Sequence, residues 1–85
     1  MNIKVKRLVL DVLKPREPQI YILASRLAEG KGVKDVSISV AEIDQQTETI
    51  KLSIEGDSIN VDDIEQRIEE LGASVRSVDE VRVSR

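Results

Sequence analysis

The chain has 85 residues, a formal net charge of −3 from 13 basic and 16 acidic side chains, and no cysteine or histidine. This length predicts a single domain, residues 1–85, and the composition excludes disulfides and the thiolate and imidazole ligands that zinc and copper prefer. It also removes the commonest catalytic base and the best nucleophile, so we expect a protein that is not an enzyme.

Composition and length also limit the classes of partner that the protein can be expected to bind. Tyr21 is the only aromatic residue, and the charge balance is slightly acidic, which together disfavour nucleic-acid binding. The apolar runs are too short to span a membrane and the N-terminus lacks signal-peptide features, so a cytoplasmic protein is expected. Because so short a chain buries only about 60–65% of its unfolded surface, added stability from a homo-oligomer is also expected.

The first expected element is a strand over residues 2–13. Leu8, Leu10 and Val12 mark one face, and the other face is also largely apolar but carries Asp11. Apolar residues on both faces are typical of a central strand. Lys14-Pro15 is expected to end it, because proline cannot donate to a sheet ladder.

A helix is expected over residues 18–29, with Pro18 in its first turn. Its stripe is Ile20, Leu23, Ala24 and Leu27, and the sequence Gly30-Lys-Gly32 is expected to stop it. Tyr21 and Ile22 lie beside the stripe, which indicates either a wide buried face or an intermolecular contact.

Two strands should follow, over residues 33–43 and 49–55, since apolar residues alternate strictly in both. The polar segment 44–47 is short enough to join them as an antiparallel hairpin. Ile43 breaks the alternation set by Val40, which indicates either a bulge or the end of regular pairing.

The second expected helix covers residues 61–71, with Asn60 as its N-cap and Gly72 as its stop. A last strand over residues 73–83 carries four valines, but they do not all alternate in step. We therefore expect an irregularity between Ser77 and Glu80.

The order strand, helix, strand, strand, helix, strand is that of a ferredoxin-like α+β sandwich, βαββαβ. Right-handed crossovers make the first and third strands central neighbours in a four-stranded antiparallel sheet, with both helices on one face. The other face is expected to stay open.

This topology predicts a cluster of carboxylates where the first strand ends and the hairpin turns, formed by Asp11, Glu42, Asp44 and Glu48. Carboxylate oxygens are the ligands that Ca²⁺ prefers, so the cluster is a candidate site for a hard divalent cation, completed by a second subunit. Asp11 is the leading candidate, because a charge within an apolar strand is costly unless paired. The alternative is an ordinary solvated strand end, balanced by Lys14, Arg16 and Lys51, and the chain has no EF-hand spacing.

A second charged feature is basic. Basic residues near both chain ends could form one patch: Lys4, Lys6, Arg7, Arg76, Arg82 and Arg85. We expect this patch either to balance the charge of the acidic second helix or to contact a neighbouring subunit.

Three segments resemble the small archaeal proteins of domain-of-unknown-function family 211: Arg7-Leu-Val-Leu-Asp-Val-Leu-Lys-Pro-Arg-Glu-Pro18, Val40-Ala-Glu-Ile-Asp-Gln-Gln-Thr-Glu48 and Ser77-Val-Asp-Glu-Val81. The resemblance runs over nearly the whole chain and implies a ferredoxin-like fold, homo-oligomers, bound calcium in some members and no established activity. It also implies that the family's acidic positions match Asp11, Glu42, Asp44 and Glu48.

Two functions follow as hypotheses. The first is a non-enzymatic homo-oligomer, with itself and a divalent cation (Ca²⁺) as partners. The second is a small-molecule-sensing regulatory module, with ligand sites at subunit interfaces near the helix starts.

Overall fold

The computed structural model describes residues 3–85, and Asn2, the expected start of the first strand, lies outside this range. Four strands and two helices follow in the predicted order. Their bounds are β1 Lys4–Pro15, α1 Ile20–Ala28, β2 Val33–Ile43, β3 Thr47–Gly56, α2 Val61–Glu70 and β4 Ser74–Ser84.

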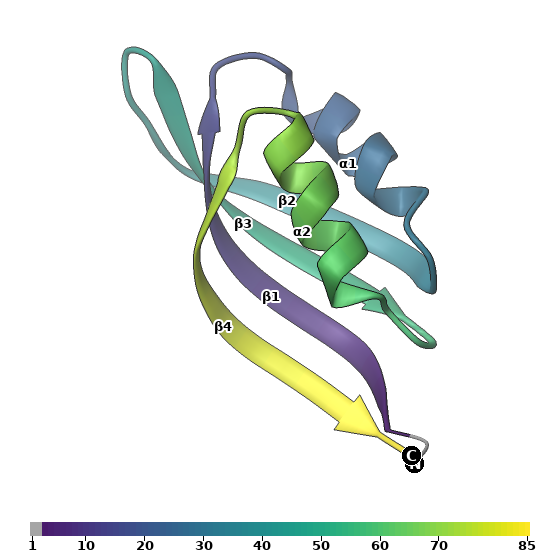
Figure 1. The fold of residues 1–85 in the computed structure, drawn as a ribbon. Coiled ribbons are helices and arrows are strands. Elements are labelled where there is room, and N and C mark those ends of the chain that lie inside the picture. Colours follow the sequence, from purple (N-terminus) through teal and green to yellow (C-terminus); the bar gives the residue numbers. More distant parts are fainter. Residues whose placement is uncertain (1–2) are drawn as a thin grey trace.

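The strands form one antiparallel sheet in the order β2-β3-β1-β4, so β1 and β3 are the central neighbours, as predicted. Figure 1 shows both helices on the same side of this sheet. The fold is therefore the ferredoxin-like α+β sandwich that the element order predicted. The sheet face away from the helices is called the open face below.

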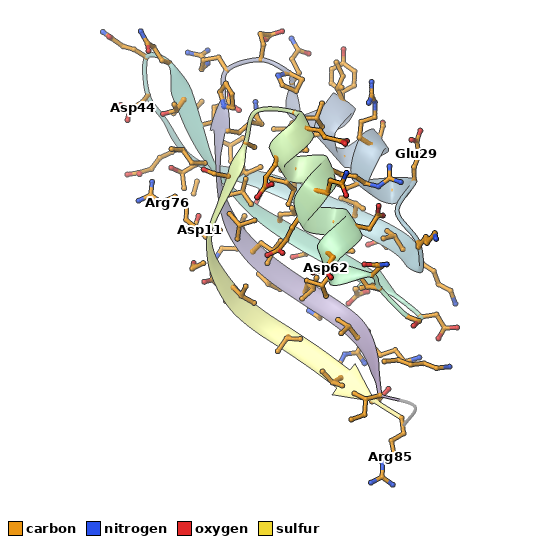
Figure 2. All side chains as sticks on the ribbon, in the orientation of Figure 1. Asp11, Glu29, Asp44, Asp62, Arg76 and Arg85 are labelled. Atoms are coloured by element: carbon orange, nitrogen blue, oxygen red, sulfur yellow. The ribbon has the colours of Figure 1, made fainter. Side chains whose placement is uncertain are left out.

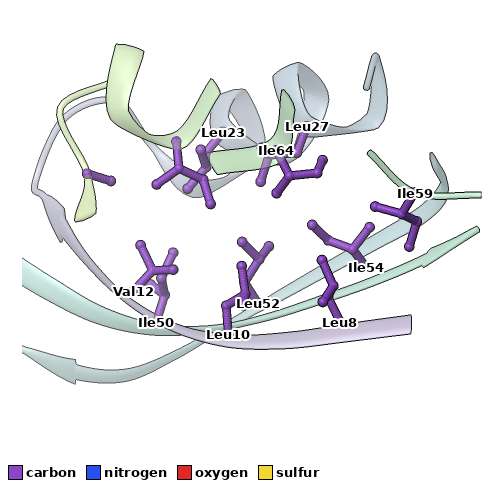
Figure 3. Packing of buried hydrophobic residues seen from close by; sticks show 12 residues of the cluster. Leu8, Leu10, Val12, Leu23, Leu27, Ile50, Leu52, Ile54, Ile59 and Ile64 are labelled. Carbon is purple, nitrogen blue, oxygen red and sulfur yellow. The ribbon is translucent and has the colours of Figure 1, made fainter. Parts of the chain in front are cut away.

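The core lies between the sheet and the helices (Figure 3). The predicted inward faces of the two central strands are confirmed, since Val12, Ile50, Leu52 and Ile54 are fully buried. The helices add Leu23, Leu27, Ile64 and Ile68, also fully buried. This alternation decides which side chains of β1 and β3 reach the helices and which reach the open face.

The second helix begins and ends as its sequence predicts. Asn60 Oδ1 accepts a hydrogen bond from the Asp63 backbone N–H at 3.0 Å, which satisfies one of the unpaired donors of the first turn. Gly72 follows the helix at φ 83°, a backbone conformation that favours glycine.

The prediction for the start of the first helix is wrong. Gln19 is the capping residue, with extended backbone angles, and Pro18 precedes it outside the helix. The reason is that the Pro18 carbonyl oxygen is held by the Lys14 ammonium, at 2.6 Å, which keeps this residue in the connecting loop.

The expected end of β1 at Leu13 is also wrong. Lys14 lies opposite Glu48 and Pro15 opposite Thr47, so pairing with β3 continues for two more residues. On the other side β4 has already stopped, because Leu13 is the last residue of β1 that it pairs. The missing N–H of Pro15 therefore interrupts no second ladder.

The expected irregularities are confirmed. The pairing of β2 with β3 shifts between Val40 and Glu42. The pairing of β1 with β4 shifts in three places, which leaves Arg76 and Asp79 of β4 and Lys6 of β1 as extra residues without a partner on the other strand.

The helix layer is shorter than the sheet. Nine and ten helical residues span about 14 Å, whereas the twelve residues of β1 span about 40 Å. Figure 1 shows the start of β1 and the end of β4 running beyond the helices. On the outer strand β4, three valines are about half exposed, at 57%, 54% and 46%, although the residues opposite two of them, Leu10 and Leu8, are buried. These three are called the valine stripe: Val78, Val81 and Val83.

Candidate functional site

The hairpin end of the sheet is organised by a buried lysine. Lys14 is 1% exposed, and its Nζ donates to the carbonyl oxygens of Pro15, Arg16 and Pro18 at 2.8, 3.2 and 2.6 Å. The same nitrogen lies 3.1 Å from Glu48 Oε1. Lys14 therefore ties the loop between β1 and α1 to the start of β3.

Arg16 completes this cluster from the loop, with its Nε 3.5 Å from Glu48 Oε2. The Glu48 side chain is 15% exposed, and each of its two carboxylate oxygens lies near a cation, Lys14 on one and Arg16 on the other. A lysine with four oxygens around its ammonium is held in place and has no free side on which to approach a substrate.

Sequence reasoning missed this buried lysine, although one signal was present. Lys14 has the same parity as Leu8, Leu10 and Val12, and so points toward the helices like them. The Lys-Pro pair was instead interpreted as the end of the strand.

Asp11 is not at the hairpin end. It lies between Lys51 of β3 and Ser77 of β4, in the middle of the open face. Lys51 itself is 2.9 Å from Asp79, and its pKa is raised, chiefly by the hydrogen bond to Asp79 and to a smaller extent by the charge of Asp11. Asp11 therefore has a neighbouring cation from its own chain.

The other three predicted ligands lie near the hairpin but on different sides of it. Glu42 is opposite Thr49 on the open face, while Glu48 is opposite Lys14 on the helix side. Asp44 is exposed at the turn, and Figure 2 shows it at the hairpin tip, away from Asp11 along the sheet.

Within residues 3–85, no three acidic side chains converge on a point that would hold a metal ion. The predicted gathering of all four carboxylates is thus not formed within one chain. Calcium binding, and the ligand roles of these residues, stay predictions.

The open face carries a second set of ion pairs. Arg7 of β1 bridges the two strands beside it, with contacts of 2.6 Å to Glu55 and 3.1 Å to Glu80. The hydrogen bond to Glu55, followed by that to Glu80, raises the Arg7 pKa. Lys6 pairs with Asp57 at 2.6 Å. These two members of the predicted basic patch are thus paired with carboxylates of β3, of β4 and of the loop after β3, and not with those of the acidic helix.

A hollow of about 330 Å³ lies beside the start of α1. Its lining combines apolar and charged side chains from the loop, the helix and the hairpin: Arg16, Glu17, Gln19, Ile20, Tyr21, Val40 and Glu48. Tyr21 is 64% exposed and Ile22 37%, so the interpretation of these residues as part of a wide buried face is wrong.

The outer strand β4 is the other candidate surface. In the described part of the chain it pairs with β1 alone, so the backbone groups along its second edge face away from the sheet. The valine stripe lies on the helix side of this strand, because Val78 and Val81 are opposite the buried Leu10 and Leu8. An exposed edge with an apolar stripe is typical of a strand that pairs with another chain.

These features define a small ferredoxin-like protein whose organised elements are a buried lysine cluster, a hollow beside α1 and an uncovered edge strand. Residues 6–85 match the DUF211 family, which is described as uncharacterized ArCR, and the chain belongs to this family. It is 44% identical over 77 residues to "Uncharacterized protein MJ0319" of Methanocaldococcus jannaschii, across 91% of this chain and 79% of the relative. No helix in residues 3–85 is long and apolar enough to cross a membrane.

Proposed function

We propose that this protein acts without catalysis, as a self-associating module that uses the β4 edge to contact a further copy of itself. The observation that carries the proposal is the valine stripe, whose three side chains are each about half exposed beside an edge with no strand partner in residues 3–85. Burial of apolar surface is the main driving force of protein association. A chain of this size also gains stability from a second copy.

The buried lysine cluster supports the non-catalytic part of the proposal. Lys14 is surrounded by oxygens of its own chain, and the open-face lysine Lys51 is engaged by Asp79. The chain has no histidine or cysteine that could replace them as base or nucleophile.

Sedimentation velocity at micromolar concentration tests the association. We expect the natural sequence to sediment as an oligomer and Val78→Thr/Val81→Thr to shift toward the monomer, because threonine keeps the side-chain shape and strand preference but adds a hydroxyl. Ile43→Thr is the matched control, since Ile43 is 64% exposed at the opposite end of the sheet. A natural sequence that sediments as a monomer would refute the proposal.

The hollow beside α1 favours a second candidate function, the binding of a small polar metabolite. Its volume lies within the range of ligand sites, about 300–1,000 Å³, and Tyr21 and Val40 give it apolar walls beside the Arg16 guanidinium. A metabolite that binds there should raise the melting temperature in metal-free buffer, and Arg16→Ala should remove the effect. Stabilisation that persists in the variant would place the ligand elsewhere.

A further inference from the structure

The hollow beside α1 contains a guanidinium group that its own chain holds only loosely. Arg16 donates from Nη1 to two carbonyl oxygens of the hairpin turn, those of Asp44 and Gln45, at 3.3 and 3.5 Å. Its Nε lies 3.5 Å from Glu48 Oε2. All three contacts are long, Nη2 takes part in none of them, and the side chain is 51% exposed. Arg16 therefore keeps donors for an anionic group of a ligand.

The first turn of α1 lines the same hollow and adds to its positive potential. The Gln19 side chain does not cap the helix, and the first turn has no acidic residue. In the described part of the chain the backbone N–H groups of Ile20 and Tyr21 consequently have no hydrogen-bond partner. The partial positive charge of a helix start favours an anionic group, as the Arg16 guanidinium does.

Glu17 gives the hollow a charge of the opposite sign. It is exposed and makes no ion pair with any residue in 3–85. Glu48, the other acid of the lining, already has Lys14 beside one oxygen and Arg16 beside the other. A plain anion such as inorganic phosphate would meet the unpaired Glu17 carboxylate, and like charges repel. A ligand with both an anionic and a cationic group would match both charges.

The remaining lining is largely apolar and belongs to Ile20, Tyr21 and Val40. Tyr21 is 64% exposed and Val40 38%, so an apolar group placed in the hollow would remove their surface from water. The volume of about 330 Å³ is near the lower end of the range for ligand sites, about 300–1,000 Å³. The ligand is therefore expected to have few atoms and one apolar part.

Resting on the second candidate function above, we propose that the ligand of the hollow is a free α-amino acid with an apolar side chain. Its carboxylate binds the Arg16 guanidinium and the N–H groups of Ile20 and Tyr21. Its ammonium group binds Glu17, and its side chain packs against Tyr21 and Val40. A purely anionic metabolite would leave Glu17 unpaired, and a purely apolar one would leave Arg16 unpaired.

Calorimetric titration in metal-free buffer tests each part of this ligand. L-leucine is the main probe, with L-valine and L-methionine to vary the side chain. Three smaller compounds each lack one group: 4-methylpentanoate the ammonium, 3-methylbutylamine the carboxylate and glycine the side chain. We expect each of them to bind about tenfold more weakly than L-leucine, or weaker still, because each leaves one surface of the hollow unmatched.

Two variants that remove one charge each assign the contacts. Glu17→Gln should weaken the binding of L-leucine by about tenfold and should not weaken that of 4-methylpentanoate, which has no ammonium group. Arg16→Gln should weaken the binding of both compounds but not that of 3-methylbutylamine. Glu65→Gln is the matched control, because Glu65 is exposed on α2 and outside the lining. It should leave every affinity unaltered, with circular dichroism confirming the fold of each variant.

The outcomes separate the amino acid from the wider class of polar metabolites. Binding of inorganic phosphate or 4-methylpentanoate that is as tight as that of L-leucine, and is lost in Arg16→Gln, would overturn the amino acid and keep the hollow as a metabolite site. A failure of all three amino acids to bind would also overturn it. Binding of L-leucine that persists unchanged in Arg16→Gln would place the ligand elsewhere and refute both.

Discussion

Replacing Lys14 with methionine should strongly destabilise the fold, although methionine is similar in length to lysine and its apolar side chain is compatible with burial. The substitution removes the donor to the Pro15, Arg16 and Pro18 carbonyl oxygens and leaves the largely buried Glu48 with Arg16 as its remaining cation, at 3.5 Å. Breaking a buried ion pair by removing one partner costs about 3–5 kcal/mol. The retained Arg16 and rehydration of the loop carbonyls favour the lower end, about 3 kcal/mol.

The assay is urea unfolding followed by circular dichroism, with the thermal midpoint as a second measure. For a domain of this size a loss of about 3 kcal/mol corresponds to a drop of roughly 12–24 °C in Tm. Lys51→Met is the matched control, because it removes the half-exposed lysine paired with Asp79 and should have a much smaller effect. The double variant Lys14→Met/Glu48→Gln should be less destabilised than the sum of its single changes. A Lys14→Met protein within about 1 kcal/mol of the natural sequence would refute this account.

Three further predictions concern acid, glycine and calcium. The hydrogen bond from the Lys51 ammonium lowers the Asp79 pKa, so the free energy of unfolding should be constant from neutral pH to about pH 5 and fall below about pH 4. Asp79→Asn should weaken that fall in urea titrations. A gain in stability on acidification would contradict this prediction. Gly32→Ala should lower the melting temperature more than Gly72→Ala. Both glycines have positive φ, at 80° and 83°, but only at Gly32 would the new Cβ meet backbone atoms, those of Ser58. Calorimetric titration with calcium should show weaker binding by Asp11→Asn; equal affinities, or no binding by either protein, would exclude Asp11 as a ligand.

The core and the topology were predictable because they depend on periodicity. Ile50, Leu52 and Ile54 alternate without interruption, and Asn60 stands directly before a stripe of helical spacing, so local pattern and tertiary position agree. The expected bulge near Ile43 was found for the same reason, since one extra residue reverses the side of every residue after it.

The candidate site was less predictable, because topology places strand ends and does not place side chains. Asp11 and Glu48 belong to neighbouring strands but point to opposite faces of the sheet, and each has a lysine of its own chain nearby. The role of Lys14 depends on three loop carbonyls, whose positions no periodic pattern encodes. The partner of Arg7 in β4 likewise depends on a register that two bulges have already shifted.

The bulges at Arg76 and Asp79 also change the spacing of the apolar residues along β4. Val75, Val78 and Val81 are three residues apart, a spacing that in a regular strand would send them to alternating faces. Here they lie opposite Val12, Leu10 and Leu8, which are two residues apart, because Arg76 and Asp79 each add one residue to the outer strand. Deleting Asp79 alone would leave Val78 and Val81 two residues apart, so both would stay on one face without a bulge, whereas a regular ladder that kept Asp79 would put them on opposite faces. The side that the strand presents to a neighbour thus depends on the number of its residues as much as on their chemistry.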